Sequence, residues 1–292
     1  MKTKFIKACA LAAVAAMALT ACGGNSSGEN GGSASAPITV VSREDGSGTR
    51  GAFTELMGIL VEEGDTKTDN TTVNATIANK TEVVIQNVAG DPNAIGYISL
   101  GSLKDGVKAV KVDGVEANAE NVLSGDYKVA RPFNIATKGE PTGVAADFIN
   151  FILSADGQEI VSDGYIPVSS EAEAFTSDGS EGKIVVGGSS SVSPIMEKLA
   201  EAYQAVNTKA TIELQESDST TGMTSCMEGT YDIGMASREL KDDELAQLTP
   251  IVIANDGIAV IVNPENAVED LTSEQIRQIY TGEIADWSEL SK

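Results

Sequence analysis

Three stretches of the sequence combine serine, threonine and glycine where an apolar run gives way to a segment of helical period. They cover residues 42–50 (SREDGSGTR), 187–194 (GGSSSVSP) and 215–222 (QESDSTTG). The first amides of a helix lack intrahelical acceptors and lie at the positive end of the helix dipole, so a helix start with added hydroxyls favours anions. Arg43 can add a guanidinium that donates two parallel hydrogen bonds to one oxyanion. Each stretch alone is ordinary helix capping, but together they predict a site for a small oxyanion.

The composition limits the chemistry of that site. The 292 residues include no histidine, and 43 acidic against 20 basic residues give a net charge of −23. Without imidazole there is no serine or cysteine nucleophile with a histidine base and no histidine zinc site. The negative charge, with no basic stripe to reverse it locally, disfavours nucleic acid as a partner. We therefore expect no catalytic residue, no metal and no cofactor.

The elements that position these stretches alternate between short apolar runs and amphipathic segments, which is typical of an α/β fold. Ser47 is the expected cap of the first helix, and Pro194 is the expected first residue of another. The strands are expected at 38–42, 94–99, 183–187, 231–236, 251–254 and 258–262. The buried helix faces are expected to be Phe53, Leu56, Met57 and Leu60; Phe148, Phe151 and Ile152; and Ile195, Leu199, Tyr203 and Val206.

The beginning of the chain has the layout of an export signal. Residues 1–21 carry three lysines followed by an apolar stretch that is too short to span a membrane stably. Residues 19–22 (LTAC) resemble the bacterial lipobox, so we expect Cys22 to be lipidated. Residues 22–36 are rich in glycine, serine and asparagine and should form a flexible tether. The alternative is an ordinary signal-cleavage site with an incidental cysteine.

Two further features concern the folded part. Loss of Cys9 with the signal and lipidation of Cys22 would leave Cys226 as the one thiol, which we interpret as a small core residue of a helix. Residues 169–182 are rich in serine, glutamate, alanine and glycine and have neither a period nor a long apolar run. This segment is predicted to be a linker between two structured regions.

The three hydroxyl-rich stretches, with residues 231–240 (YDIGMASREL), closely resemble the phosphate-binding lipoproteins of bacterial high-affinity phosphate ABC transporters. Residues 93–97 (NAIGY), 271–282 and Trp287 extend the likeness to nearly all of 38–290. The resemblance implies a two-lobed, periplasmic-binding-protein-like α/β fold of type II. The ligand would lie in a central cleft, and the lobes would close like a hinge.

The order of the two halves departs from the family. There the stretch resembling 183–287 normally precedes the stretch resembling 38–168, so this chain resembles a circular permutant. Permutation is tolerated at exposed loops, and it implies that the present termini lie close together. The alternative is a unit cut from a tandem array, whose halves swap between copies. The implied parts are 37–128 (lobe II, first part), 129–254 (lobe I, with the linker 169–182) and 255–292 (lobe II, second part), with crossings near 129–132 and 254–257.

Carried over by position, the resemblance implies a phosphate site between the lobes. In it, Arg43 would be the only arginine in direct contact with the anion. Lobe II would supply Arg43, Ser47, Gly48 and Thr49, and lobe I would supply Ser191, Val192, Ser193, Ser219 and Ser237.

One position departs from the family pattern. The family often places an aspartate after a strand like 231–236, where it accepts the proton of hydrogen phosphate and rejects fully ionised sulfate. This sequence has Ser237 and Arg238 there. Because an ionised carboxylate accepts but cannot donate a hydrogen bond, Asp218 and Asp45 are the candidate acceptors. Arg238 would either add positive charge to the site or form a salt bridge with Glu239 or Asp242.

The function implied by the resemblance is binding of inorganic phosphate and its delivery to the permease of an ABC transporter. The protein would be held on the extracytoplasmic face of the cell membrane by the lipid at Cys22, as a monomer or a swapped dimer. The alternatives are a binding protein for sulfate, molybdate or tungstate, and a surface or signalling protein that no longer transports. A secreted phosphatase using a serine of residues 45–49 lacks an evident base and a two-metal carboxylate cluster.

Overall fold

The computed structural model describes residues 36–64 and 66–291. The predicted signal peptide, Cys22 and the tether up to residue 35 lie outside the described residues. In the described part of the chain, no helix is long and apolar enough to cross a membrane.

The alternation of apolar runs and amphipathic segments produces the predicted α/β fold, built on one ten-stranded sheet. Two short strands, β6 (Lys108–Ala109) and β9 (Ile166–Pro167), pair with β13 beside the main path. The main path runs through β11 (Ala210–Ser217), β10 (Gly182–Ser189), β12 (Ile233–Ala236), β8 (Ala130–Thr137), β13 (Thr249–Val262), β5 (Ala94–Ser99), β1 (Thr39–Arg43) and β4 (Thr76–Ala78).

The remaining elements pack on this sheet or extend from it. Two small sheets pair β14 (Asp270–Leu271) with β7 (Lys111–Val112) and β2 (Leu60–Glu63) with β3 (Thr66–Asp69). The α-helices are α1 (Gly48–Leu56), α2 (Thr81–Ala89), α3 (Ala119–Ser124), α4 (Val144–Leu153), α5 (Ala155–Val161), α6 (Ser193–Val206), α7 (Ser219–Met227), α8 (Asp242–Leu245) and α9 (Ser273–Thr281).

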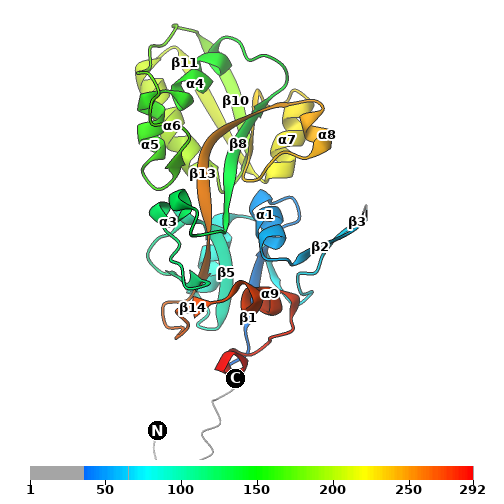
Figure 1. Cartoon of the computed structure of the whole chain (residues 1–292). Coiled ribbons are helices and arrows are strands. Elements are labelled where there is room, and N and C mark those ends of the chain that lie inside the picture. The colour runs from blue at the N-terminus through cyan, green and yellow to red at the C-terminus, as the bar shows by residue number, and fades with distance from the viewer. Residues whose placement is uncertain (1–35, 65, 292) are drawn as a thin grey trace, which may run out of the picture. The chain divides into compact units, whose positions relative to one another are not determined.

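Strands β8 and β13 lie side by side at the centre of the sheet (Figure 1). The prediction of separate strands at 251–254 and 258–262 was wrong, because β13 is one strand with a bulge between Val252 and Ala254. Its first part pairs with β8 and its last part, from Ile258, pairs with β5. Strand β13 therefore links the β8 side of the sheet to the β5 side.

The buried apolar residues form separate cores along this sheet. One core uses residues between Phe133 and Ala254, including the predicted face of α4 and the predicted face of α6 except Val206. Two further cores lie beyond the paired residues 130–132 of β8 and 255–257 of β13. They use residues 40–129 and 258–280. Cys226 of α7 is fully buried in a small satellite core, and burial raises the pKa of its thiol. The interpretation of Cys226 as a core residue is confirmed.

Two of the predicted helix faces extend too far. Helix α1 ends at Leu56, which is 43% exposed, and Leu60 lies beyond the helix as the first residue of β2. Val206 is the last residue of α6 and is 59% exposed. Leu56 and Val206 are thus exposed last residues of their helices, and Leu60 lies outside the helix. Phe53, Met57 and Tyr203 are buried as expected.

The predicted linker connects β9 to β10 and has no helix or strand before Gly182. The buried Asp147 carboxylate of α4 anchors it, since it accepts hydrogen bonds from Ser177 Oγ (2.7 Å) and Asp178 N (3.0 Å). Tyr203 Oη (2.8 Å) and Asn207 Nδ2 (3.3 Å) donate to the same carboxylate. These five residues are called the Asp147 cluster below.

The first and last described segments lie side by side, as expected. Ile38 N donates to Ala285 O at 2.9 Å, and Trp287 N donates to Ala36 O at 3.0 Å. Pro37 and Asp286 form an isolated antiparallel bridge between them. The two ends of the folded region are therefore joined by backbone hydrogen bonds.

Candidate functional site

The hydroxyl-rich stretches lie where strands end and helices begin, as their sequences predict. Ser47 caps α1 by accepting a hydrogen bond from Arg50 N at 3.3 Å, and Asp218 caps α7 by accepting one from Thr221 N at 2.9 Å. Helix α6 begins at Ser193, one residue before Pro194. A fourth junction, from β4 to α2, was not among the predicted stretches and brings Thr81 to the same place.

Side-chain hydroxyls from these junctions meet in one buried group. Thr49 Oγ1 lies 2.8 Å from Ser191 Oγ and 3.1 Å from Ser237 Oγ, and Ser189 Oγ donates to Ser237 Oγ at 2.9 Å. Thr81 Oγ1 lies 3.2 Å from Ser191 Oγ. We call this group the hydroxyl cluster; its members, all buried, are Thr49, Thr81, Ser189, Ser190, Ser191, Ser219 and Ser237.

The hydroxyl cluster lies between the two sets of cores. Thr49 and Thr81 follow strands beside the cores of 40–129, whereas the serines end β10 or follow β10, β11 and β12 beside the core of 133–254. Next to the cluster, Thr220 N and Thr220 Oγ1 donate to Gly46 O at 3.1 and 3.2 Å. The two halves therefore touch through polar atoms at this point.

Arg43 provides a buried guanidinium at one side of the cluster. It ends β1, is 2% exposed, and donates from Nη2 to Ser190 Oγ (3.0 Å) and from Nη1 to Thr81 Oγ1 (3.3 Å). Its Nε and Nη2 also donate to the carboxylate of Glu44, at 2.8 and 2.7 Å. The planar fork is thus held in place and directed at two hydroxyls.

Gly48 is required by the close approach of the two halves. A Cβ atom at this position would lie 2.4 Å from Ser219 Oγ and 3.0 Å from Ser237 Oγ. Ser219 Oγ in turn accepts a hydrogen bond from Ser237 N at 3.1 Å. Only a residue without a side chain lets the start of α1 come this close to Ser219.

Three predicted site residues direct their side chains elsewhere. The hydroxyl of Ser47 caps its own helix, and the hydroxyl of Ser193 donates to Ser189 O at 3.2 Å. Val192 is buried in the apolar core, and its amide donates to Ser189 O at 3.0 Å. The structure therefore gives these residues roles in shaping the helix starts.

The two candidate proton acceptors do not contact the hydroxyl cluster. Asp218 accepts from Thr221 N at 2.9 Å and from Thr221 Oγ1 at 2.6 Å. The side chain of Asp45 is 94% exposed and pairs with Arg50 Nη1 at 2.6 Å. Asp218 does lie close to Gly46 of the other half, because a Cβ on Gly46 would fall 2.3 Å from Asp218 Oδ1.

Arg238 forms a salt bridge, but with neither predicted partner. Its Nη1 and Nη2 donate to the Glu244 carboxylate at 2.7 and 2.8 Å, and its contact with Glu239 is to the backbone oxygen. Helix α8 places Glu244 in its first turn, where the carboxylate also accepts from Lys241 N at 2.8 Å. Glu244 thereby holds the guanidinium of Arg238 away from the hydroxyl cluster.

The sequence analysis missed one cation at the cluster. Arg131 of β8 is 5% exposed and forms a salt bridge with the buried Asp256 of β13. Its Nη2 donates to Thr49 Oγ1 at 3.2 Å, and its Nε donates to Ser237 O at 3.4 Å. Burial lowers the pKa of Arg131 and raises the pKa of Asp256, and the charge of each opposes the shift of the other.

Three hydroxyls of the cluster were also missed. Ser189 and Ser190 lie in the stretch 187–194, so their sequence signal was present but was carried over only to the residues after them. Thr81 has a weaker signal, a single threonine that opens an amphipathic helix. Arg131 has none, because it is an isolated arginine in an apolar strand.

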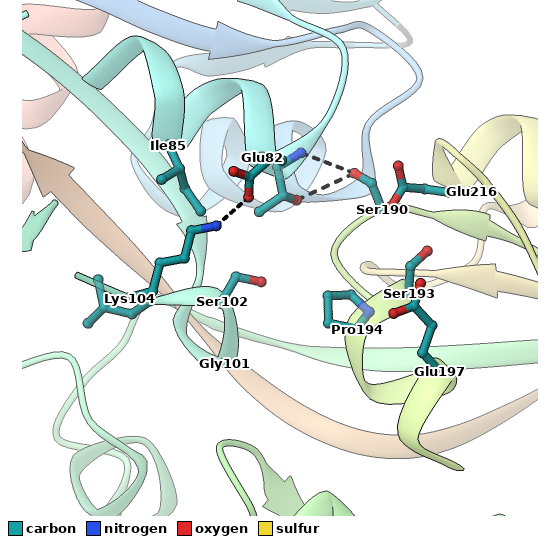
Figure 2. Close-up of a pocket in the computed structure, with 12 residues that line it drawn as sticks. Glu82, Ile85, Gly101, Ser102, Lys104, Ser190, Ser193, Pro194, Glu197 and Glu216 are labelled. Carbon is teal, nitrogen blue, oxygen red and sulfur yellow. Dashed lines mark hydrogen bonds and ion pairs between the residues drawn. The ribbon is translucent and has the colours of Figure 1, made fainter. Parts of the chain in front are cut away.

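Two pockets flank the hydroxyl cluster. The first, of about 360 Å³, reaches Thr81 and Ser190 and is lined by Glu82, Glu197 and Glu216. Figure 2 shows Ser190 on one wall of this pocket and Glu82, paired with Lys104 at 2.6 Å, on the other. The second, of about 460 Å³, reaches Ser47 and carries more cations than carboxylates, with Arg50, Arg238 and Lys241 against Asp45 and Asp69.

The arrangement is made of hydrogen-bond donors and cations. Among residues 36–64 and 66–291, no group of histidine, cysteine, aspartate and glutamate is placed to hold a metal ion. Hydroxyls, helix starts and two guanidiniums together suit a small anion.

Comparison with known proteins decides the family. Residues 4–156 and 171–292 match a sequence family described as a PBP superfamily domain. The chain is 50% identical over 279 residues to the phosphate-binding protein PstS 2 of Streptococcus agalactiae serotype V, covering 94% of this chain and 93% of that protein. The chain belongs to the PstS family of phosphate-binding proteins. Its fold is that of the two-lobed periplasmic binding proteins, as predicted.

Two further matches agree. The PstS 2 protein of Streptococcus pneumoniae serotype 4 is 47% identical over 290 residues, or 98% of this chain and 99% of that protein. A crystal structure of a phosphate-binding protein of a phosphate ABC transporter from Streptococcus pneumoniae TIGR4 has a TM-score of 0.70 at 47% identity, over 87% of this chain and 99% of that chain. These full-length matches also show that the chain has its halves in the same order as these PstS relatives.

Proposed function

We propose that this protein binds inorganic phosphate at the hydroxyl cluster and delivers it to the permease of an ABC transporter, without performing a reaction. The observation that carries the proposal is the lack of a built-in anion. In the described part of the chain, the hydroxyls of the cluster contact one another, backbone groups and two guanidiniums, but no carboxylate. A bound phosphate supplies the missing acceptor. PstS relatives that match nearly the whole chain support this ligand.

The proposed direct ligands come from both halves of the site. A phosphate that accepts hydrogen bonds from both halves stabilises the closed arrangement, because opening would leave each half without its acceptor. Ser47, Val192 and Ser193 contribute by fixing the helix starts whose first amides face the site. The side chains and amides that we propose to contact phosphate are those of Arg43, Gly48, Thr49, Ser191, Ser219 and Ser237.

A second candidate ligand is another tetrahedral oxyanion such as sulfate. This alternative is favoured by the position of the acidic side chains, since neither Asp45 nor Asp218 reaches the cluster. A site without a carboxylate acceptor does not distinguish hydrogen phosphate from sulfate by a proton. Asp218, beside Gly46, is the better placed of the two for a water-mediated contact.

The test is a calorimetric titration of residues 23–292, first freed of ligand, with phosphate and then with sulfate. One phosphate bound per chain at submicromolar affinity, with no heat from sulfate, supports the proposed function. Equal binding of both anions supports the broader oxyanion function. No binding of either rejects both, and hydrolysis of a phosphate monoester by the purified protein revives the phosphatase alternative.

We propose further that Cys22 carries a lipid that holds the protein on the extracytoplasmic face of the membrane. The support is the sequence of residues 1–36, in which three lysines and an apolar stretch precede residues 19–22 (LTAC) and the polar stretch predicted to be a flexible tether. Metabolic labelling with a radioactive fatty acid should mark the wild-type protein and not a Cys22→Ala variant. The variant should also be released into the soluble fraction.

The lobe boundaries 37–128, 129–254 and 255–292 and the permuted order also remain proposals. They are supported by the separation of the apolar cores at the β8–β13 crossing and by the hydrogen bonds between residues 36–38 and 285–287. A rearranged gene that joins residue 290 to residue 37 and opens the chain at residue 176 should produce a monomer that binds phosphate as tightly as the original. A rearranged chain that dimerises or fails to bind favours swapped halves.

A further inference from the structure

Arg131 occupies an unusual place for a cation. It lies on β8, directly opposite Asp256 in the antiparallel register with β13. At this point both strands pass from one apolar core to the next. Both side chains are buried, and Arg131 Nη1 also donates to Gly257 O at 2.9 Å and Asp256 O at 3.2 Å. The guanidinium is therefore fixed by β13 on one side.

The other side of the same guanidinium faces the hydroxyl cluster. Nη2 donates to Thr49 Oγ1 at 3.2 Å, and Thr49 Oγ1 lies 3.1 Å from Ser237 Oγ. Nε lies 3.4 Å from Ser237 O, on the opposite half of the site. Arg131 thus reaches the cluster at the point where a hydroxyl from each half meets.

Arg131 and Arg43 approach the cluster from opposite ends of one line of hydroxyls. Thr81 Oγ1 is 3.3 Å from Arg43 Nη1 and 3.2 Å from Ser191 Oγ. Ser191 Oγ is 2.8 Å from Thr49 Oγ1, which accepts from Arg131. Two buried guanidiniums at opposite ends of this line repel each other in a low-dielectric environment, and a negative charge between them would offset that repulsion.

Each guanidinium has a carboxylate on its outer side only. Glu44 pairs with Arg43 and Asp256 pairs with Arg131, so the two ion pairs together carry no net charge. The inner sides of both guanidiniums meet neutral hydroxyls. This is the electrostatic arrangement expected for a site that binds an anion between two cations and balances the excess charge from behind.

We propose that Arg131 is a second anion-binding arginine and that Asp256 is its positioning residue. The inference rests on the proposed function, since it assumes that phosphate occupies the hydroxyl cluster. Phosphate bound between Thr49, Ser191 and Ser237 accepts a charge-assisted hydrogen bond from Arg131 Nη2, in place of the one that Thr49 accepts. Asp256 keeps the guanidinium turned toward that position.

The test compares binding by the full chain and by a double variant, Arg131→Met with Asp256→Asn. Replacing both partners avoids leaving one buried charge unpaired, which alone would destabilise the fold. The control, Arg277→Met with Glu274→Gln, removes the same two charges at the surface of α9, where Arg277 also pairs with the exposed Glu283. Phosphate affinity is measured by calorimetry and folding by urea denaturation. We expect the Arg131 double variant to fold and to lose at least about tenfold in phosphate affinity, and the control to lose none.

Two readouts separate a binding role from a structural one. The loss of affinity should be larger at a pH well above the second pKa of phosphate than well below it, because the attraction to a guanidinium grows with ligand charge. Arg131→Lys, which keeps the charge, should retain more affinity than Arg131→Met. A folded double variant that binds phosphate as the wild type does at both pH values would overturn the proposal. Failure of the wild type itself to bind phosphate would reject the proposed function instead.

Discussion

Among the described residues, the Asp147 cluster and the hydroxyl cluster are both centred on buried polar groups, but they differ in one respect. The Asp147 cluster surrounds a carboxylate, which accepts hydrogen bonds from Ser177, Asp178, Tyr203 and Asn207. The hydroxyl cluster is richer in donors, with two guanidiniums at its edges, but has no anion of its own among the described residues. The first cluster includes its own acceptor, and under the function proposed above the second receives its acceptor when an anion binds.

The comparison teaches how to tell a structural polar cluster from a binding site. Buried donors are costly without acceptors, so a fold that needs only stability places an acceptor among them, as Asp147 shows. A fold that must bind and release an anion leaves that acceptor out. Mutations should therefore distinguish the clusters. Changes at the hydroxyl cluster should mainly alter phosphate affinity, and changes at the Asp147 cluster should mainly alter the free energy of unfolding.

The largest effect is expected from Arg43→Ala. Loss of a buried charge-assisted donor should weaken phosphate binding by about 2 to 5 kcal/mol. The substitution also leaves the partly exposed Glu44 without its ion-pair partner, so the free energy of unfolding without phosphate should fall too, but by less than the loss in binding free energy. Calorimetry and urea denaturation measure the two quantities. Unchanged affinity would remove Arg43 from the site.

Asp147→Ala should have the opposite profile. Removing the carboxylate takes the acceptor from the buried Tyr203 hydroxyl and from the linker donors of Ser177 and Asp178, which should lower the free energy of unfolding by about 1 to 3 kcal/mol. Phosphate affinity should stay at the wild-type value. Exchange of the Asp178 amide hydrogen with solvent should accelerate, because that amide loses its acceptor. A variant that is stable but binds phosphate poorly would break the distinction between the clusters.

The Asp147 cluster should also make stability depend on pH. Burial opposes ionisation of Asp147, but its hydrogen bonds more than offset that effect and lower its pKa below the ordinary 3.8. A carboxylate with a lowered pKa contributes stability above its unfolded pKa and loses it as the pH falls through the folded value. Unfolding free energies measured at decreasing pH below about 4 should fall less steeply in Asp147→Asn than in the wild type. Equal slopes would show that this carboxylate does not carry the effect.

The smallest effect is expected in the pocket lined by Ser47, Thr220 and Arg238. Lys241 lines the more cationic of the two flanking pockets and is exposed. Lys241→Gln should slow phosphate association by less than about threefold, and only at low salt, because exposed charges are screened beyond about 8 Å at physiological ionic strength. Stopped-flow measurements at two salt concentrations test this. A matched Lys104→Gln variant, at the acidic pocket, should change the rate less.

The parts of the site that could be predicted from the sequence are those that depend on local patterns of neighbouring residues. Arg43 ends a strand, Ser191 follows one, and Thr49 and Ser219 lie in the first turns of helices, so their positions depend on residues within a few places of them. These were the residues that the structure brings together. The binding roles of all of them stay predictions until titrations are made.

The sequence did not predict the parts that depend on pairing between distant segments. Arg131 reaches the hydroxyl cluster only because β8 pairs with β13, which places Asp256 opposite it although the two are 125 positions apart. The partner of Arg238 was likewise missed because the short helix α8 turns Glu244 back toward it. The predicted strands 251–254 and 258–262 form one strand because residues 255–257 between them pair with residues 130–132 of β8, and no local pattern of these residues predicts that pairing.

Strand β13 has a consequence for how the protein unfolds. Its residue Ala254 belongs to one apolar core, while Ile258, Val260 and Val262 belong to another, with only a few residues of the same strand between them. If the sheet of one half unfolds, β13 also loses its pairing and packing in the other half. The two lobes should therefore melt together in a single cooperative transition, even though each has a core of its own.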